Sequence, residues 1–297
     1  MELRNLKVLV EVARQGGFTE AARVLASTQS TVSKAIRALE DELGLPLLHR
    51  AHRQVVPTSA GEIVLAHGRK MLGLREDMLT QIAALKGVQH GRLRLGVPRV
   101  GGDALFAPIF ARFCASHPGI DIALHEAGSA DLRELLHSGD LDLAGLLLPV
   151  PEAFATRELA CEPLMALVPA HHPLAGRGAL GLGDLADVPL VMFDTGFVLH
   201  AMITRAFRAR QLQPRVAART SQIGFMLELV AAGVGVAFLP RMIARLHMRP
   251  GVAALALAAP GLEWRMALAW RRGGVLSPAA QAWLDAAAPP GAAQPIL

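Results

Sequence analysis

The chain has 297 residues, of which 52% are hydrophobic and two are cysteines, with a formal net charge of +5 at pH 7. This length allows two domains with separate cores, two cysteines exclude a disulfide framework, and no apolar run reaches the ~20 residues of a membrane span. The N-terminus carries a glutamate at position 2 and a helical period, which excludes a secretory signal. We therefore expect a cytoplasmic protein without membrane association, whose mild positive charge is compatible with a nucleic-acid partner.

Two short helices around a tight turn are predicted near the N-terminus, above a first helix that ends at residues 15–17. The first of the pair is expected to start behind Thr19. The second is expected to cover residues 29–43, with Thr28 as its N-cap and Gly44 as its C-cap. Its apolar positions share one stripe of a 3.6-residue helical period. These positions are Val32, Ile36, Leu39 and Leu43.

Another face of the second helix is short, polar and basic. Two short crossed helices with such a face form the helix-turn-helix reader of the DNA major groove. We expect residues near the helix start to contact base edges and the arginines to contact phosphates. The alternative is an ordinary helical pair with a solvated polar face. The motif runs from Phe18 to Arg37, and the candidate DNA-binding residues are Thr19, Thr28, Gln29, Ser30, Thr31, Ser33, Lys34, Arg37, Arg50 and Arg53.

The following segment contains two short strand-like runs, residues 47–49 and 54–56, around a tip with Arg50, His52 and Arg53. This pattern predicts a basic wing, which favours DNA binding over the alternative.

Many positions at fixed offsets over residues 1–61 carry a family resemblance. The hydroxyl-rich helix start at residues 29–33, the run AIRALEDELGLPLLHR and the exit PTSAG resemble the DNA-binding domain of LysR-type transcriptional regulators. Ser30 stands where that family usually has a proline, and a serine in the first helical turn is tolerated.

A long helix is predicted from a capping box of Ser59 and Glu62 to about residue 86. A helix that joins two domains has nothing of its own to bury against, so a second copy of itself is the simplest partner. The alternative is packing on the C-terminal domain. The resemblance implies that this helix pairs two subunits and that tetramers form. The apolar stripe consists of Val64, Met71, Met78, Ile82 and Leu85.

From residue 92 the pattern changes to alternating strands and helices. A βαβαβ order over residues 92–148 predicts a parallel sheet, a long strand or two at 157–169 leaves it, and a second α/β set covers 189–239. A final strand at 264–270 and a helix at 278–287 follow. This arrangement resembles the two-lobed effector domain of the same family, which is periplasmic-binding-protein-like of type 2.

The expected fold class is therefore α/β overall, with an N-terminal all-α winged helix-turn-helix, a long linker helix and a C-terminal two-lobed α/β effector domain. The expected domains are residues 1–58 for DNA binding, 59–89 for the linker and dimerisation helix, and 90–297 for effector binding. Within the last, lobe I takes 90–161 and 266–290, lobe II takes 162–265, and 291–297 form a frayed tail.

Ligands of open α/β sheets lie past the carboxyl ends of strands and at helix N-termini. The alternative for each hydroxyl at such a turn is that it only caps its own helix. Arg99 suits an anionic ligand, whereas Asp103 and Asp194 would repel one, so the ligand's charge stays open. The resemblance implies an effector between the lobes at Val100, Gly101, Ser129, Thr195, Ile223 and Gly224.

Motifs for cofactor binding, metal binding and catalysis are incomplete in this sequence. Residues 233–235 lack the third glycine of a dinucleotide-binding loop, so we expect no cofactor. The two histidines at 171–172 have no cysteine or acidic residue at a spacing typical of metal ligands, so we expect no metal. No coherent catalytic set is present, so we do not expect an enzyme. Cys114 and Cys161 are expected to be reduced, packed thiols, with a redox pair as the alternative.

The sequence thus predicts a bacterial transcriptional regulator that binds dyad-symmetric promoter DNA and senses a small-molecule effector between two lobes. Its expected partners are double-stranded DNA, the effector and a second copy of the chain, with RNA polymerase as a further candidate. The alternative is a solute-binding or catalytic α/β protein with an incidental N-terminal helical domain.

Overall fold

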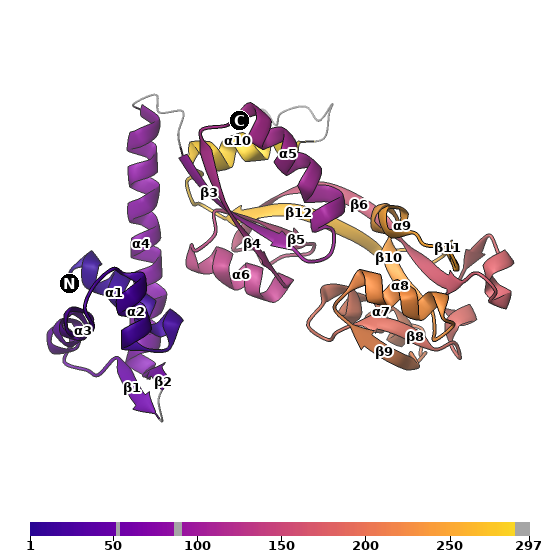
Figure 1. The fold of residues 1–297 in the computed structure, drawn as a ribbon, viewed down its shortest axis with the longest axis horizontal. Coiled ribbons are helices and arrows are strands. Elements are labelled where there is room, and N and C mark those ends of the chain that lie inside the picture. Colours follow the sequence, from indigo (N-terminus) through magenta and orange to yellow (C-terminus); the bar gives the residue numbers. More distant parts are fainter. Residues whose placement is uncertain (52–53, 86–90, 289–297) are drawn as a thin grey trace.

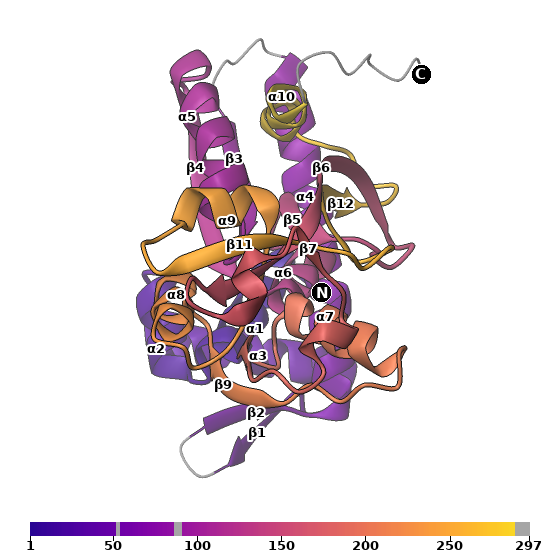
Figure 2. The same cartoon turned by 90° about the vertical axis from the view of Figure 1, so that its right-hand side faces the viewer.

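The computed structural model describes residues 1–51, 54–85 and 91–288. Figure 1 shows a small N-terminal domain around one end of a long helix, beside a larger α/β part with two lobes. Figure 2 shows that a short hairpin of β1 (Leu48–Ala51) and β2 (Gln54–Pro57) projects from the N-terminal domain, at the end of the molecule opposite to α10 (Pro278–Ala287). This succession of helix-turn-helix, linker helix and α/β domain confirms the predicted fold class.

The N-terminal core forms because three short helices each turn an apolar stripe toward the other two. Gly16 ends the first helix in the left-handed conformation (φ 67°), and Thr28 and Gly44 (φ 68°) bound the third, as predicted. Ala21 and Ala22 are buried, and their small side chains let the second helix approach its neighbours closely. The helices are α1 (Leu3–Gln15), α2 (Phe18–Val24) and α3 (Gln29–Leu43).

Two details of the helical pair differ from the prediction. Leu43 is 40% exposed, because α3 ends there and the core is already filled by the three earlier stripe residues. The helix α2 begins at Phe18 and is preceded by Gly17, so Thr19 lies inside the first turn and is not an N-cap.

The long helix α4 (Ser59–Leu85) has its cap one residue earlier than predicted. The Thr58 hydroxyl accepts a hydrogen bond from the Gly61 amide (2.9 Å) and donates to the Pro46 carbonyl (2.7 Å). The predicted capping box of Ser59 and Glu62 is therefore wrong, because the contact with Pro46 fixes the Thr58 hydroxyl at the helix start. The same bonds tie α4 to the loop that precedes the hairpin.

One side of α4 packs on the rest of the protein and the other side is exposed. Leu65 is buried in the N-terminal core, and Gly73 faces Arg271 of lobe I, so the predicted alternative of packing on the C-terminal domain holds for this side. Val64 is half-buried on the same core. The exposed side carries large apolar residues, and the side chain of Leu85 lies outside the described residues. The exposed apolar residues are Ile63, Met71, Leu74, Met78, Leu79 and Ile82.

Lobe I is built on three parallel strands, as predicted, with β3 between β4 and β5. The strand β12 extends this sheet in the antiparallel direction beside β5. The first helix of this lobe, α5, is preceded by a π-helical turn, η1 (Gly102–Phe106). The elements are β3 (Gly91–Pro98), α5 (Ala107–Ser116), β4 (Ile120–Ala127), α6 (Ser129–Ser138), β5 (Leu143–Leu147), β12 (Glu263–Arg271) and α10 (Pro278–Ala287).

The strand β6 (Phe154–Pro169) runs from lobe I into lobe II. It pairs with β12 as far as Pro163 and with β10 and β11 from Leu164 onward. The helix α9 and the strands β7 and β11 were not predicted. The lobe II elements are η2 (Pro173–Gly176), β7 (Ala179–Leu180), η3 (Gly183–Leu185), β8 (Leu190–Phe193), α7 (Val198–Arg208), β9 (Val216–Thr220), α8 (Ile223–Ala231), β10 (Ala237–Pro240), α9 (Arg241–His247) and β11 (Val252–Leu257).

Candidate nucleic-acid interface and effector site

The start of α3 is organised by a hydroxyl cluster. The Thr28 hydroxyl accepts a hydrogen bond from the Thr31 amide (3.2 Å), which satisfies one of the free N–H groups of the first turn. The same oxygen lies 3.0 Å from the Ser30 hydroxyl and 2.8 Å from the Thr31 hydroxyl. All three residues are exposed, so their remaining donors and acceptors face the solvent at the helix start.

We call Gln29, Ser30, Ser33, Lys34 and Arg37 the reading face. Four of these residues are exposed and Ser33 is half-buried, while the apolar stripe of α3 is buried on the other side. Within the described parts of the chain, no ion pair neutralises the cations of this face. The face can therefore present hydroxyl, amide and cationic groups together to a DNA groove.

The acidic residues of α3 lie beyond the reading face, and two of the three, Glu40 and Glu42, have partners elsewhere. The Glu40 carboxylate accepts a hydrogen bond from the Leu47 amide (2.8 Å), which holds the chain that leaves α3. Glu42 pairs with the N-terminal ammonium group of Met1. Negative charge is thus held away from the helix start, where DNA phosphates would approach.

The N-cap of α3 allows a first prediction. Replacing Thr28 by alanine removes the acceptor of the Thr31 amide and is expected to destabilise the N-terminal domain by about 1 kcal/mol. Serine keeps the hydroxyl oxygen, so Thr28→Ser is expected to retain most of the stability. Urea unfolding of both variants without DNA measures the difference, and equal losses in the two variants would contradict a capping role.

The predicted wing is present as an antiparallel hairpin in which Arg50 pairs with Val55. The Val55 amide donates to the Gly16 carbonyl (3.0 Å), so the hairpin is fixed to the turn that follows α1. The side chain of Arg50 and the whole of Arg53 lie outside the described residues, and their contacts with DNA remain predictions. Thr19 is exposed on α2 and remains a candidate contact, although it does not cap the helix.

Two of the six predicted effector residues meet in a small cavity of about 30 Å³ between the lobes. Val100 and Ser129 line it from lobe I, and residues 196–199 line it from the start of α7. Ser129 is the first residue of α6, and Gly128 holds the N-cap position, so the Ser129 hydroxyl is not used as the helix cap. A volume of this size holds about one water molecule.

The other predicted effector residues do not line this cavity. Gly101 adopts a left-handed conformation (φ 93°) under Trp264, where a Cβ would lie 2.7 Å from the indole ring. Thr195 is exposed, and Ile223 starts α8. A Cβ on Gly224 would lie 3.2 Å from the Arg249 guanidinium.

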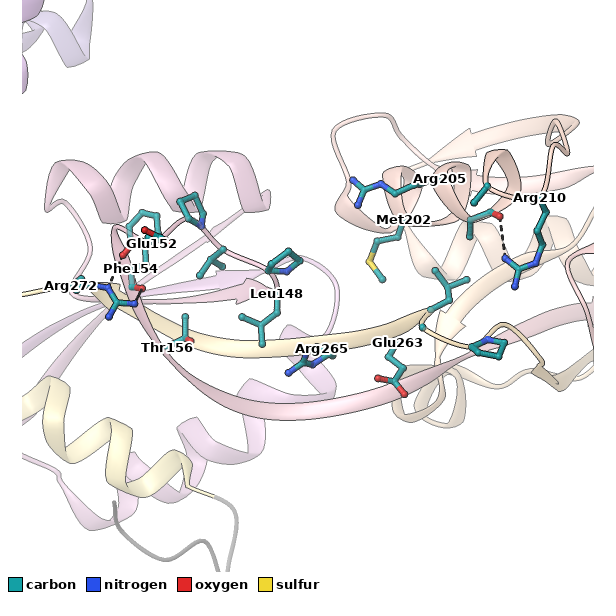
Figure 3. Close-up of a pocket in the computed structure, with 18 residues that line it drawn as sticks. Leu148, Glu152, Phe154, Thr156, Met202, Arg205, Arg210, Glu263, Arg265 and Arg272 are labelled. Carbon is teal, nitrogen blue, oxygen red and sulfur yellow. Dashed lines mark hydrogen bonds between the residues drawn. The ribbon is translucent and has the colours of Figure 1, made fainter. Parts of the chain in front are cut away.

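A second, larger cavity of about 850 Å³ lies alongside α7 and was missed by sequence reasoning. Its walls come from residues 148–156, one face of α7, residues 260–265 and Arg272 (Figure 3). No sequence signal identifies it, because four separate segments form it only after β6 and β12 have paired. We call this cavity the α7 groove.

The cysteine prediction was half right. Cys114 and Cys161 are free thiols, but both are exposed and not packed. Although Cys161 is exposed, partial desolvation of its sulfur, followed by the hydrogen bond with the adjacent Glu263 carboxylate, raises the pKa of the thiol. A raised pKa lowers the thiolate fraction at neutral pH, which disfavours the redox alternative. Among the described residues, no three potential metal ligands lie together, and none of the helices could span a membrane.

A winged helix-turn-helix joined by a long helix to a two-lobed α/β domain defines a DNA-binding regulator with an effector-binding domain. Residues 3–62 match the family described as bacterial regulatory helix-turn-helix protein, lysR family, and residues 86–289 match the LysR substrate binding domain. The chain therefore belongs to the LysR family of transcriptional regulators. It binds DNA through the helix-turn-helix and is not an enzyme, so the predicted solute-binding or catalytic alternative does not hold.

Individual relatives cover almost the whole chain. An uncharacterized HTH-type transcriptional regulator, YwbI of Bacillus subtilis, is 33% identical over 286 residues, or 96% of this chain and 95% of the relative. A full-length OxyR variant from Pseudomonas aeruginosa is 26% identical with a TM-score of 0.79, over 97% of this chain and 94% of that chain. Full-length CbnR, solved with its target DNA, shares the fold at 23% identity and a TM-score of 0.64, over 97% and 99% of the two chains.

Proposed function

We propose that two copies of this chain bind a dyad-symmetric promoter site in the cytoplasm of a bacterium, each through its reading face. The observation that carries this proposal is the exposure of Lys34 and Arg37 on the side of α3 opposite to its buried stripe. A helix-turn-helix dimer contacts two half-sites about one helical turn of DNA apart, so the geometry of the pair sets the spacing. RNA polymerase is a candidate further partner at such a promoter.

The pairing element in this proposal is α4. Its exposed side carries apolar residues at intervals of three and four, as in a helix that packs on a copy of itself. Association of two such pairs into a tetramer is part of the same proposal.

The effector in this proposal binds between the lobes, at the turns that hold Val100, Gly101, Ser129, Thr195, Ile223 and Gly224. The unused hydroxyl of Ser129 and its position at a helix start support this location. The present cavity there is small, so a ligand must either be very small or separate the lobes. Binding changes DNA recognition only if the ligand has different affinities for two arrangements of the subunits.

The reading face is tested by mobility shift with the DNA upstream of the gene and with a random duplex at matched salt. Lys34→Ala and Ser33→Ala are expected to lower the preference for the promoter by about 1–3 kcal/mol, because they remove base-edge contacts. Promoter binding no tighter than binding to the random duplex would overturn the proposal.

Arg37→Ala is the matched control on the same helix. We expect it to weaken binding to both duplexes equally and to reduce the salt slope by about one unit, because a phosphate contact is lost. A change in sequence preference caused by Arg37→Ala would show that the assignment of base and phosphate contacts is wrong.

A further inference from the structure

The α7 groove has the size of a small-molecule site. Its volume of about 850 Å³ lies within the range of ~300–1,000 Å³ typical of ligand pockets. The cavity at the predicted effector turns holds about 30 Å³ and shares no lining residue with it. The groove is therefore a separate space that a metabolite can enter without movement of the lobes.

One face of α7 forms the lobe II wall of the groove. Met202, Arg205, Ala206 and Ala209 line it at the spacing i, i+3, i+4 and i+7. Figure 3 shows Met202 and Arg205 extending from the helix toward the side where Leu148 lies. The groove thus has a cationic group beside apolar surface from both lobes.

The charges of the groove favour an anion near α7. Among the described residues, the Arg205 side chain has no hydrogen-bond or ion-pair partner, and the Arg210 guanidinium donates only to the Ala206 carbonyl (3.3 Å). Arg265 is neutralised by both oxygens of Glu158, at 3.1 and 2.6 Å. Arg272 donates to the carbonyls of residues 152 and 154, so its charge has no carboxylate partner in the described part of the chain.

Two carboxylates also border the groove, but they lie apart from Arg205. The Glu263 carboxylate points away from α7 in Figure 3 and accepts a hydrogen bond from the Cys161 thiol (3.4 Å). Glu152 lies at the opposite end, beside Arg272. A ligand with its anionic group at Arg205 therefore keeps its distance from both acids.

We propose that the α7 groove binds a small organic anion, with its carboxylate or sulfonate group at Arg205 and its apolar body against Leu148, Val150 and Met202. Guanidinium groups bind such anions through paired N–H donors, and the apolar walls add affinity for a hydrocarbon or aromatic body. Because the walls come from both lobes, an occupant would also affect how the lobes are arranged. Only this last consequence depends on the proposed function.

The test uses the fluorescent anion 1-anilinonaphthalene-8-sulfonate, titrated into the full-length protein. Arg205→Gln is expected to weaken probe binding on the order of tenfold, because a charge-assisted hydrogen bond is lost. Arg208→Gln removes the same charge from the same helix outside the groove and is expected to leave binding unchanged. Equal effects of the two variants would overturn the proposal.

A steric pair tests the location independently of charge. Ala209→Trp fills the groove from an exposed position and is expected to abolish probe binding. Ala201→Trp adds the same side chain at an exposed position of α7 that does not line the groove, and it is expected to leave probe binding largely unchanged. Competition with 4-phenylbutyrate and with its neutral amide tests the ligand class. The acid is expected to displace the probe and the amide to fail, and equal displacement by the amide would overturn the requirement for an anion.

Mobility shift of the same variants without ligand separates this proposal from the proposed function. Arg205→Gln is expected to bind promoter DNA as the unmodified protein does, since α7 is distant from the reading face (Figure 1). If Arg205→Gln and Arg208→Gln weaken probe binding equally while promoter binding is intact, only the anion site is overturned. Absence of promoter binding in the unmodified protein overturns the proposed function alone.

Discussion

Replacing Met78 by glutamate is expected to convert the paired protein into monomers and to weaken promoter binding by about a hundredfold, because a monomer engages only one half-site. Met78 is 52% exposed at the centre of an apolar stripe on α4, and Leu74 beside it is 66% exposed. A carboxylate buried between two such helices would lose its hydration without gaining a partner. Light scattering measures the mass, and mobility shift measures the affinity.

Met78→Leu is the matched control, because it keeps the volume and apolar character of the side chain. We expect the leucine variant to remain paired and to bind DNA normally. An unchanged mass for Met78→Glu would mean that α4 is not the pairing element, and the exposed stripe would then need another partner.

Local signals predicted the N-terminal domain well. The caps of α3, Thr28 and Gly44, act at the residues that the sequence indicated, because a cap depends only on its own helix terminus. The start of α4 was misplaced by one residue, since the hydroxyl of Thr58 is held by Pro46, twelve residues earlier in the chain. That contact exists only after the hairpin has folded back on α4.

The C-terminal domain shows where periodicity stops being informative. The parallel strands of lobe I were predicted because each buried run alternates with a helix. The strand β11 was missed because its role is set by antiparallel pairing with β6, more than eighty residues away in sequence at Val252 and Pro169. The α7 groove was missed for the same reason, since its walls meet only through tertiary pairing.

The predicted effector residues also fall into two groups, those within lobe I and those in lobe II. Ser129 and Val100 line the same cavity because both follow strands of one parallel sheet, and the carboxyl ends of such strands lie at one edge of the sheet. Thr195, Ile223 and Gly224 belong to lobe II, and their distance from lobe I depends on the angle between the lobes. A sequence pattern carries no measure of that angle.

Gly61→Ala is expected to destabilise the N-terminal domain by about 3 kcal/mol, the upper part of the range for overpacking. A Cβ at this position would lie 2.0 Å from the Leu47 carbonyl oxygen and 3.0 Å from its carbon, and neither backbone atom can rotate away. Moving α4 outward would stretch the bonds of the Thr58 hydroxyl to both the Gly61 amide and the Pro46 carbonyl. Urea unfolding measures the loss, and promoter affinity should fall with the folded fraction.

Gly68→Ala on the same helix is the comparison that isolates this clash from helix propensity. Its Cβ would meet the Leu6 side chain at 3.2 Å, and the contacted atom, Cδ2, is the end of a flexible side chain. Alanine also favours the helix by about 1 kcal/mol relative to glycine, which offsets that contact. We therefore expect the stability of Gly68→Ala to stay within about 1 kcal/mol of the unmodified protein. If the two variants lost equal stability, the close approach of Leu47 to α4 would not be what requires glycine at position 61.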